Sequence, residues 1–150
     1  MSERFDAAYD LHLLLAHVRT VRHLRYQVAL IAPENLYDLN ASATSCLIVY
    51  GEYSSQTIYG EPSGNHCQRA WHDTIHQELQ AHVDAASEYR VARQQALEAE
   101  RLAGTTLADL LWADLWGQTC YFTQFADFPT DQASFVWHYL KTGKLPKEPM

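Results

Sequence analysis

Apolar side chains recur at helical spacing along most of the 150-residue chain. In residues 4–32 they recur every three or four positions, and Pro33 ends the pattern. This stretch therefore predicts one amphipathic helix or two consecutive helices. The polar stretch 34–45, rich in Asn, Ala and Ser, predicts a loop. Four further helices, separated by glycine and proline breaks, are predicted at about 66–83, 86–103, 106–125 and 130–142.

Two short runs of β-branched and aromatic residues predict strands, at 46–50 and 56–59. Residues 51–55 between them are typical of a hairpin connection. A two-stranded hairpin is marginal alone, so we expect it to pack against helices. The turn at 61–65 leads into the next helix, with Asn65 as its expected N-cap.

These patterns predict a mainly α (α+β) fold, with about five helices and one small β-hairpin. The length suits a single domain over residues 1–150. The tail from about residue 144 contains two prolines and is expected to fray.

Composition narrows the class of protein. The chain is 47% hydrophobic and 19% charged, which excludes an intrinsically disordered chain. No apolar run approaches the ~20 residues needed to span a bilayer, and the first residues do not resemble a secretion signal. Three widely separated cysteines argue against a disulfide framework. We therefore expect a cytoplasmic protein that does not contact a membrane.

The net charge of −7 bears on partners. An acidic surface disfavours nucleic-acid binding, which depends on neutralising phosphates. The same charge suits a basic protein partner, although many enzymes are equally acidic. The sequence does not predict an oligomeric state.

The most informative stretch is a helix that carries His72 and His76. Residues four apart share one helical face, which allows both imidazoles to bind one zinc ion. Asp73 follows the first histidine, at the position where zinc proteases of the His-Glu-x-x-His type carry the carboxylate that activates water. Asp73 is therefore the candidate catalytic residue.

A zinc site needs a third protein ligand, and Glu88 at the start of the next helix is the first candidate. A tight antiparallel helical hairpin would leave Glu88 roughly 9 Å from His76 along the helix axis. Glu88 can reach the metal only if the two helices cross, or if residues 83–87 form an extended turn.

Asp114 is the second candidate for an additional metal ligand. It lies on the helix at 106–125, four residues after Leu110, where the pattern calls for an apolar side chain. A buried carboxylate must be paired, hydrogen-bonded, protonated or bound to metal. Gln118, one turn later, points the same way and could donate a hydrogen bond to it.

The residues from about 46 to 95 resemble the gluzincin-type and related phage-repressor-cleaving metallopeptidases. In those families a small sheet precedes a His-Glu-x-x-His helix, and a carboxylate on the next helix completes the site. Asp73 departs from the pattern because it is one methylene shorter than glutamate. A general base displaced by ~1 Å can cost on the order of 100-fold in rate, so we expect weak or absent peptidase activity.

A second resemblance covers more of the chain. The segments Arg69–Asp73, Ser87–Glu88 and Trp116–Gln118 are similar to three boxes of uncharacterised proteins from phages and mobile elements. Those proteins carry an Arg-Ala-x-His-Asp box, a later Gly-Glu pair and a Thr-Glu-x-x-Gly-Gln box. In this chain Ser87 replaces the glycine and Asp114 replaces the last glutamate. The resemblance implies a phage or mobile-element origin and no established chemistry.

Each candidate also has an ordinary structural explanation. The histidine spacing can arise by chance in a chain with eight histidines. Asp73 can simply interact favourably with the helix dipole as an acidic residue in the first turns of its helix, and Glu88 can be a simple capping residue. Asp114 can pair with an arginine in a buried network, the three possible partners being Arg69, Arg90 and Arg93.

Two functions therefore stay open. In the first, the chain is a small or degenerate metal-dependent hydrolase of phage or mobile-element type, with zinc as the possible cofactor. In the second, it is a non-enzymatic, acidic, helical protein that binds and inhibits a host or partner protein. The sequence names neither the substrate nor the partner.

Overall fold

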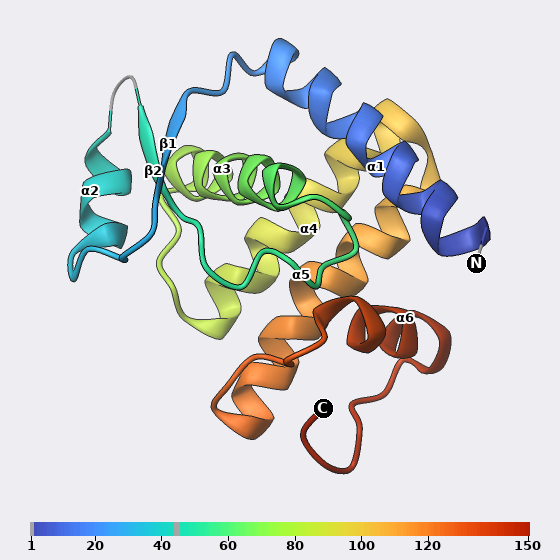
Figure 1. Cartoon of the computed structure of the whole chain (residues 1–150). Coiled ribbons are helices and arrows are strands. Elements are labelled where there is room, and N and C mark those ends of the chain that lie inside the picture. Colours follow the sequence, from blue (N-terminus) through green and yellow to red (C-terminus); the bar gives the residue numbers. More distant parts are fainter. Residues whose placement is uncertain (1, 44–45) are drawn as a thin grey trace.

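The computed structural model describes residues 2–43 and 46–150. Within these ranges it contains six helices and one two-stranded sheet (Figure 1), which confirms the mainly α prediction. In chain order the elements are α1 (Ser2–Val21), β1 (Tyr26–Ala29), α2 (Leu36–Ser42), β2 (Leu47–Tyr50), α3 (Pro62–Leu79), α4 (Ala85–Ala103), α5 (Thr105–Phe125) and α6 (Gln132–Thr142).

The predicted β-hairpin is wrong. β2 coincides with the expected strand at 46–50, but it pairs in parallel with β1, from Tyr26 opposite Leu47 to Ala29 opposite Tyr50. The helical prediction for 4–32 holds only as far as Val21, after which His23 has a positive φ of 52°. Residues 56–59 form no strand; their apolar members are buried in the core instead.

The stretch 34–45, predicted as a loop, contains the short helix α2. Its residue Asn40 is buried and bonds to the middle of β2: Oδ1 accepts from the Ile48 N–H, and Nδ2 donates to the Ile48 carbonyl, both at 2.8 Å. The Asn40 side-chain amide thus makes the two backbone hydrogen bonds that a neighbouring strand would make, and it fixes α2 beside the sheet.

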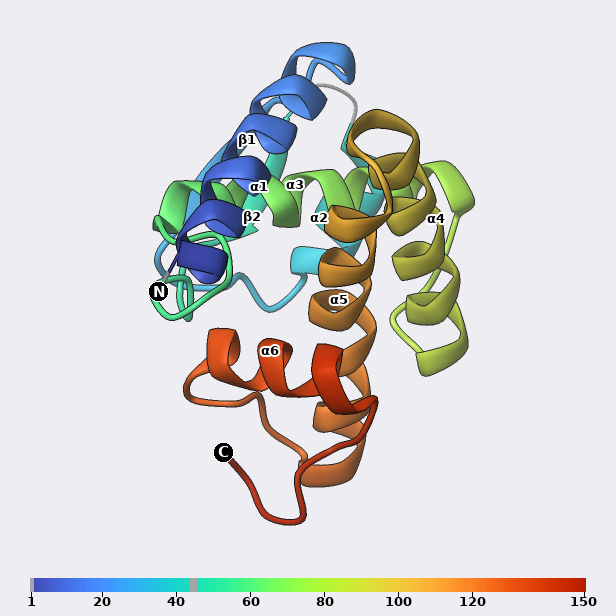
Figure 2. The ribbon, with the colours of Figure 1, turned by 90° about the vertical axis from the view of Figure 1, so that its right-hand side faces the viewer.

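The connection between α3 and α4 decides how their side chains meet. α3 begins at Pro62, so the prediction that Asn65 is its N-cap is wrong. Asn65 is instead a buried residue near the start of the helix, where its Oδ1 accepts a hydrogen bond from the Ser54 hydroxyl at 3.0 Å. α3 ends in a left-handed residue, Gln80, and residues 80–84 separate it from α4. Figures 1 and 2 show α4 crossing α3 rather than running beside it.

One apolar core joins α1, α3, α4, α5 and α6. Trp71 and Ile75 of α3 lie within it and are fully buried. Gly117 of α5 allows the close approach of α6, because a Cβ there would lie 2.9 Å from the Tyr139 ring. Within the described ranges no helix combines the length and apolar character needed to cross a membrane.

The tail from residue 144, which we expected to fray, returns to α5 in the structure. The Met150 N–H donates to the Tyr121 hydroxyl at 2.8 Å, and the Met150 carbonyl accepts from the Thr130 N–H at 3.1 Å. Leu145 also packs against the core.

Candidate metal centre

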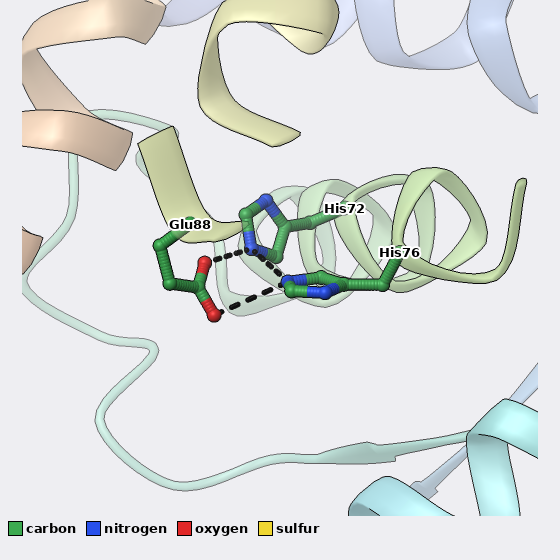
Figure 3. Close-up of side chains that lie close together, drawn as sticks. All are labelled: His72, His76 and Glu88. Atoms are coloured by element: carbon green, nitrogen blue, oxygen red, sulfur yellow. Dashed lines mark hydrogen bonds and ion pairs between the residues drawn. The ribbon is translucent and has the colours of Figure 1, made fainter. Parts of the chain in front are cut away.

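Three of the predicted ligands lie together. His72 and His76 come from consecutive turns of α3, and Glu88 comes from the first turn of α4 (Figure 3). The His72 Nε2 lies 3.0 Å from Glu88 Oε2, and the His76 Nε2 lies 3.2 Å from Glu88 Oε1. The two Nε2 atoms are 3.2 Å apart. This is a cluster of side chains that could hold a metal ion.

The start of α4 explains how Glu88 reaches both histidines. Asp84 is the N-cap, where its carboxylate accepts from the N–H and the hydroxyl of Ser87 at 2.9 and 3.0 Å. With the cap supplied by Asp84, the Glu88 carboxylate is directed at α3 instead. The crossing of the two helices therefore meets one of the two conditions that the sequence set for Glu88; the other is not met, since residues 85–87 already belong to α4.

The spacing of the two histidine nitrogens suits a tetrahedral metal ion. With bonds of about 2.0–2.1 Å, the corners of a zinc tetrahedron lie roughly 3.3 Å apart. The two Nε2 atoms, 3.2 Å apart, are close to that edge length, and they face different oxygens of the Glu88 carboxylate, at 3.0 and 3.2 Å. The three side chains could therefore hold zinc, and three protein ligands would leave a fourth position open.

The other ring nitrogen of each histidine faces an oxygen atom. The His72 Nδ1 lies 2.9 Å from Oε1 of Gln95, and the His76 Nδ1 lies 3.3 Å from the Ala81 carbonyl. Histidines that bind metals almost always make such an outer contact, which fixes the ring orientation. Both rings are thus oriented with Nε2 toward Glu88.

In this cluster the surroundings favour a positive charge on His72 and a negative charge on Glu88. Burial alone would lower the pKa of His72, but the hydrogen bond to Glu88 and its charge outweigh burial and raise that pKa. Burial acts to raise the pKa of Glu88, yet the hydrogen bonds from His72 and His76 lower it to about 2. Glu88 is therefore a carboxylate at any physiological pH and available as a metal ligand.

Asp73 lies beside this cluster but is not one of its three members. Its half-buried carboxylate accepts from Nδ2 of Asn40 at 3.1 Å, and burial raises its pKa. Asn40 is itself fixed to Ile48 of β2, so the sheet and α2 hold Asp73 in place. The predicted base is thus a positioned carboxylate near the three ligands.

The expectation that Asp114 ligates the same metal is not met, because its carboxylate is outside the cluster of three. It is buried as predicted, and it accepts from the Tyr59 hydroxyl at 2.6 Å and from Nε2 of Gln118 at 2.5 Å. Burial raises its pKa against these hydrogen bonds. Among the described residues no arginine forms an ion pair with it. The donors are a tyrosine, which the sequence did not indicate, and the expected glutamine.

Replacing Asp114 with leucine should therefore lower stability and leave metal binding intact. The fully buried Tyr59 hydroxyl would lose its acceptor, which costs about 1–3 kcal/mol. In a chain of this size that corresponds to roughly 3–10 °C in Tm. Thermal melts with and without chelator test this, with Asp114→Asn as a control that keeps an acceptor oxygen. A leucine variant that folds normally but no longer responds to chelator would restore Asp114 as a ligand.

Two hollows adjoin the cluster. The α2 hollow, about 460 Å³, lies between α2 and the end of α3, and the α5 hollow, about 590 Å³, lies between β2, α3 and α5. The linings of the two hollows have five residues in common: Leu36, His72, Asp73, Val83 and Glu88. The two hollows therefore meet at the ligands and give a bound molecule access from either side.

The walls of the α5 hollow differ in character from those of the α2 hollow. Tyr50, Tyr53 and Phe122 give it an aromatic lining, and the Arg69 guanidinium lies among them, donating to the carbonyls of Tyr50 and Tyr53. Burial lowers the pKa of Arg69, while nearby Asp114 and Asp73 act to raise it. The hollow thus combines apolar surface with a few polar groups, as ligand pockets usually do.

Sequence reasoning missed three residues: Asn40 and Gln95, which contact Asp73 and His72 of the site, and Tyr59, which donates to the buried Asp114. Asn40 and Tyr59 lie in segments without helical periodicity, so no local signal marked them. Gln95 did have a signal, because it occupies the α4 stripe between the buried residues Val91 and Ala99. A polar residue at an apolar position is the same pattern that singled out Asp114.

No protein-family model, curated protein or solved structure matches this chain. The function is therefore argued from the chemistry of the centre and of the two hollows beside it.

Proposed function

We propose that the chain is a small metal-dependent hydrolase that holds zinc with His72, His76 and Glu88. The observation that carries this proposal is the pair of histidine Nε2 atoms 3.2 Å apart, each within 3.2 Å of an oxygen of the Glu88 carboxylate, beside two hollows that meet there. Two histidines and one carboxylate are a ligand set known from catalytic zinc sites. The resemblance to proteins of phages and mobile elements gives the biological setting that we propose.

Access to the centre argues for catalysis over a purely structural role. Structural zinc sites are usually closed by four protein ligands, whereas catalytic sites have three and keep one position for water or substrate. Here three ligands adjoin open space on two sides. A substrate could enter from the α2 hollow, from the α5 hollow or across both.

Asp73 is the residue of this chain that we assign to proton transfer. Bound zinc would supply a Lewis acid and would lower the pKa of a coordinated water to about 7. Asp73 lies on the shared wall of both hollows, where it can accept a proton from water and pass it to a leaving group. Asn40 holds the carboxylate through one oxygen, and the other accepts no hydrogen bond from the described residues, which leaves it for that task.

Metal analysis and a hydrolysis assay test the proposal together. Protein purified without a histidine tag should bind about one zinc per chain and should hydrolyse an activated ester such as p-nitrophenyl acetate. The double variant His72→Ala, His76→Ala should lose both properties. The matched control His12→Ala, His17→Ala removes two exposed histidines of α1 and should keep both. Absence of zinc binding, or undiminished hydrolysis in the first double variant, would refute the proposal.

A second candidate function is that of an acidic helical protein that binds a partner protein. One observation favours it: Phe5, Tyr9 and Leu13 form a stripe along α1 with exposed fractions of 73, 58 and 51%. A variant with serine at these three positions would lose a partner captured from a host extract, while the variant lacking His72 and His76 would still capture it. The reverse result would assign partner binding to the metal centre.

A further inference from the structure

Aromatic side chains line the α5 hollow and yet remain exposed. Tyr53, Phe122 and Phe128 belong to its lining, with exposed fractions of 68, 47 and 49%. The rings of Phe122 and Phe128 lie with their centroids 5.0 Å apart. Large apolar side chains left exposed around a hollow are typical of a ligand-binding site. The α2 hollow has one such ring among its described residues, the half-buried Tyr37, whose hydroxyl already donates to the Ala81 carbonyl at 2.7 Å.

The backbone of Tyr53 is held in an uncommon conformation. Its φ is 58°, in the left-handed region that few bulky residues adopt. Its carbonyl accepts from Nε2 of Gln132 at 2.9 Å and from Nη2 of Arg69 at 3.4 Å. The start of α6 and the middle of α3 thus fix the conformation of a residue whose side chain stays exposed. A strained residue that is held in place without being buried points to a function for its side chain.

The charged side chains of the hollow have partners within the protein. Asp114 is buried, and both of its oxygens accept hydrogen bonds. Arg69 donates to two backbone carbonyls, and nearby Asp114 and Asp73 favour its positive charge against burial. Glu88 faces the two histidines of the metal centre. Taking a charge out of water without a new partner is costly, so the described lining favours an uncharged group over an anion or an ammonium.

We propose that the α5 hollow binds an uncharged aromatic group of the substrate, against Tyr53, Phe122 and Phe128, with the scissile bond at the metal centre. This inference rests on the proposed hydrolase function and names its substrate class, an ester or amide with an uncharged aromatic group beside the bond that is cleaved. Water adds to the carbonyl carbon, the C–O or C–N bond breaks, and the leaving oxygen or nitrogen takes up a proton. His72 and Glu88 line the same hollow, so a molecule bound there lies next to the ligands.

Binding of a neutral probe is the first test. N-acetylphenylalaninamide carries a phenyl ring, two amides and no charge. It is titrated into the full chain with chelator present, so that no metal contributes, and NMR follows the backbone N–H signals. The probe should shift the signals of Tyr53, Thr119 and Gln132 in the α5 hollow and leave those of Tyr37 and Gln80 in the α2 hollow unchanged. Shifts confined to the α2 hollow, or no saturable shift at all, would overturn the inference.

Two charged relatives of the probe test whether the bound group must be uncharged. N-acetylphenylalanine ends in a carboxylate, and phenylalaninamide carries an ammonium at about pH 6. Each should bind at least about fivefold more weakly than the neutral probe, because the lining has no free charge that would replace the lost hydration. If the acid bound as tightly or more tightly, Arg69 would be an anion-binding residue. If the amine did so, the carboxylates would bind a cation, and either result would overturn the inference.

Removing one ring from the lining is the next test. Phe122→Ser should weaken binding of the neutral probe by about tenfold, since an aromatic contact and its apolar area are lost. Phe5→Ser is the matched control, because it makes the same change at an exposed phenylalanine of α1, and it should leave the affinity unchanged. Phe128→Ser, outside the helices, carries the same expectation as Phe122→Ser and replaces it if that variant does not fold. Full affinity in a folded variant of either residue would overturn the inference.

Competition with hydrolysis separates this inference from the proposed function. N-acetylphenylalaninamide should raise the KM for p-nitrophenyl acetate and leave kcat unchanged, because both molecules need the same space. If the original protein neither binds zinc nor hydrolyses the ester, the proposed function fails, and the titration still shows whether the hollow binds an uncharged aromatic group. If the ester is hydrolysed and the bound probe does not raise KM, the hydrolase stands and the role of the α5 hollow in substrate binding fails.

Discussion

Replacing Glu88 with glutamine should abolish zinc binding and the thermal stabilisation that comes with it. Zinc at 100 times its Kd stabilises the folded state by about 2.7 kcal/mol, because it binds only that state. For a chain of this size this is an increase of roughly 5–10 °C in Tm. The Glu88 carboxylate faces both ligand nitrogens, at 3.0 and 3.2 Å, and is the only negative ligand of the three. Its neutral isostere should show no shift at the same zinc concentration.

Differential scanning calorimetry with and without zinc measures this effect. Glu100→Gln is the matched control, since Glu100 lies on the same helix, is exposed and undergoes the same change of charge. It should retain the full zinc-dependent shift. If Glu88→Gln retained that shift as well, His72 and His76 would bind zinc without Glu88, and the centre proposed here would be wrong in its third ligand.

The local part of this centre could be predicted from sequence because it follows from helical geometry. The spacing of His72 and His76 fixes their shared face, and the neighbouring residues Trp71 and Ile75 fix that face at the edge of the core. The glycine break at Gly104 likewise ends α4 as expected. Features within one helix need no knowledge of the rest of the fold.

The sheet could not be predicted because its pairing is not local. β1 lies within a stretch whose apolar spacing also suits a helix, and the sequence gives no sign that it pairs with a strand beyond α2. Parallel strands need a crossover connection, so no turn between adjacent segments marks them. The hairpin at 46–59 was the nearest local solution, and it was wrong for that reason.

The partners of the buried carboxylates were also beyond local reasoning. Asp114 was identified correctly as buried, but its donor Tyr59 is 55 positions away in the sequence, in a segment for which a strand was wrongly predicted. Asp73 was likewise chosen from its place beside His72, whereas its support by Asn40 depends on α2, which the sequence did not predict. Sequence pattern identified which residues need partners, and only the fold supplied them.

Replacing Asp73 with asparagine should lower the rate of hydrolysis and leave zinc in place. A positioned general base typically contributes 10²–10⁴-fold, so kcat should fall by at least about 100-fold. The base must be ionised, so activity should rise with pH, and burial moves the midpoint of that rise above the ordinary Asp pKa of 3.8. Asparagine cannot titrate, so the part of this rise that belongs to Asp73 should disappear from the pH–rate profile. Equal profiles for the two proteins would place the base elsewhere.

Replacing Asp73 with glutamate tests the same role by lengthening the side chain while keeping its carboxylate. The helix fixes the Cβ of residue 73, so aspartate cannot recover the length of the missing methylene without a backbone shift. Moving a general base by ~1 Å can change a rate by on the order of 100-fold, so Asp73→Glu should raise hydrolysis above that of the original protein. The longer side chain must also leave Asn40, which now holds the carboxylate at 3.1 Å. A rate order of Glu above Asp above Asn at equal zinc content would assign the base to this position. A glutamate variant no faster than asparagine would mean that the hydrogen bond from Asn40, and not the reach of the carboxylate, sets the activity.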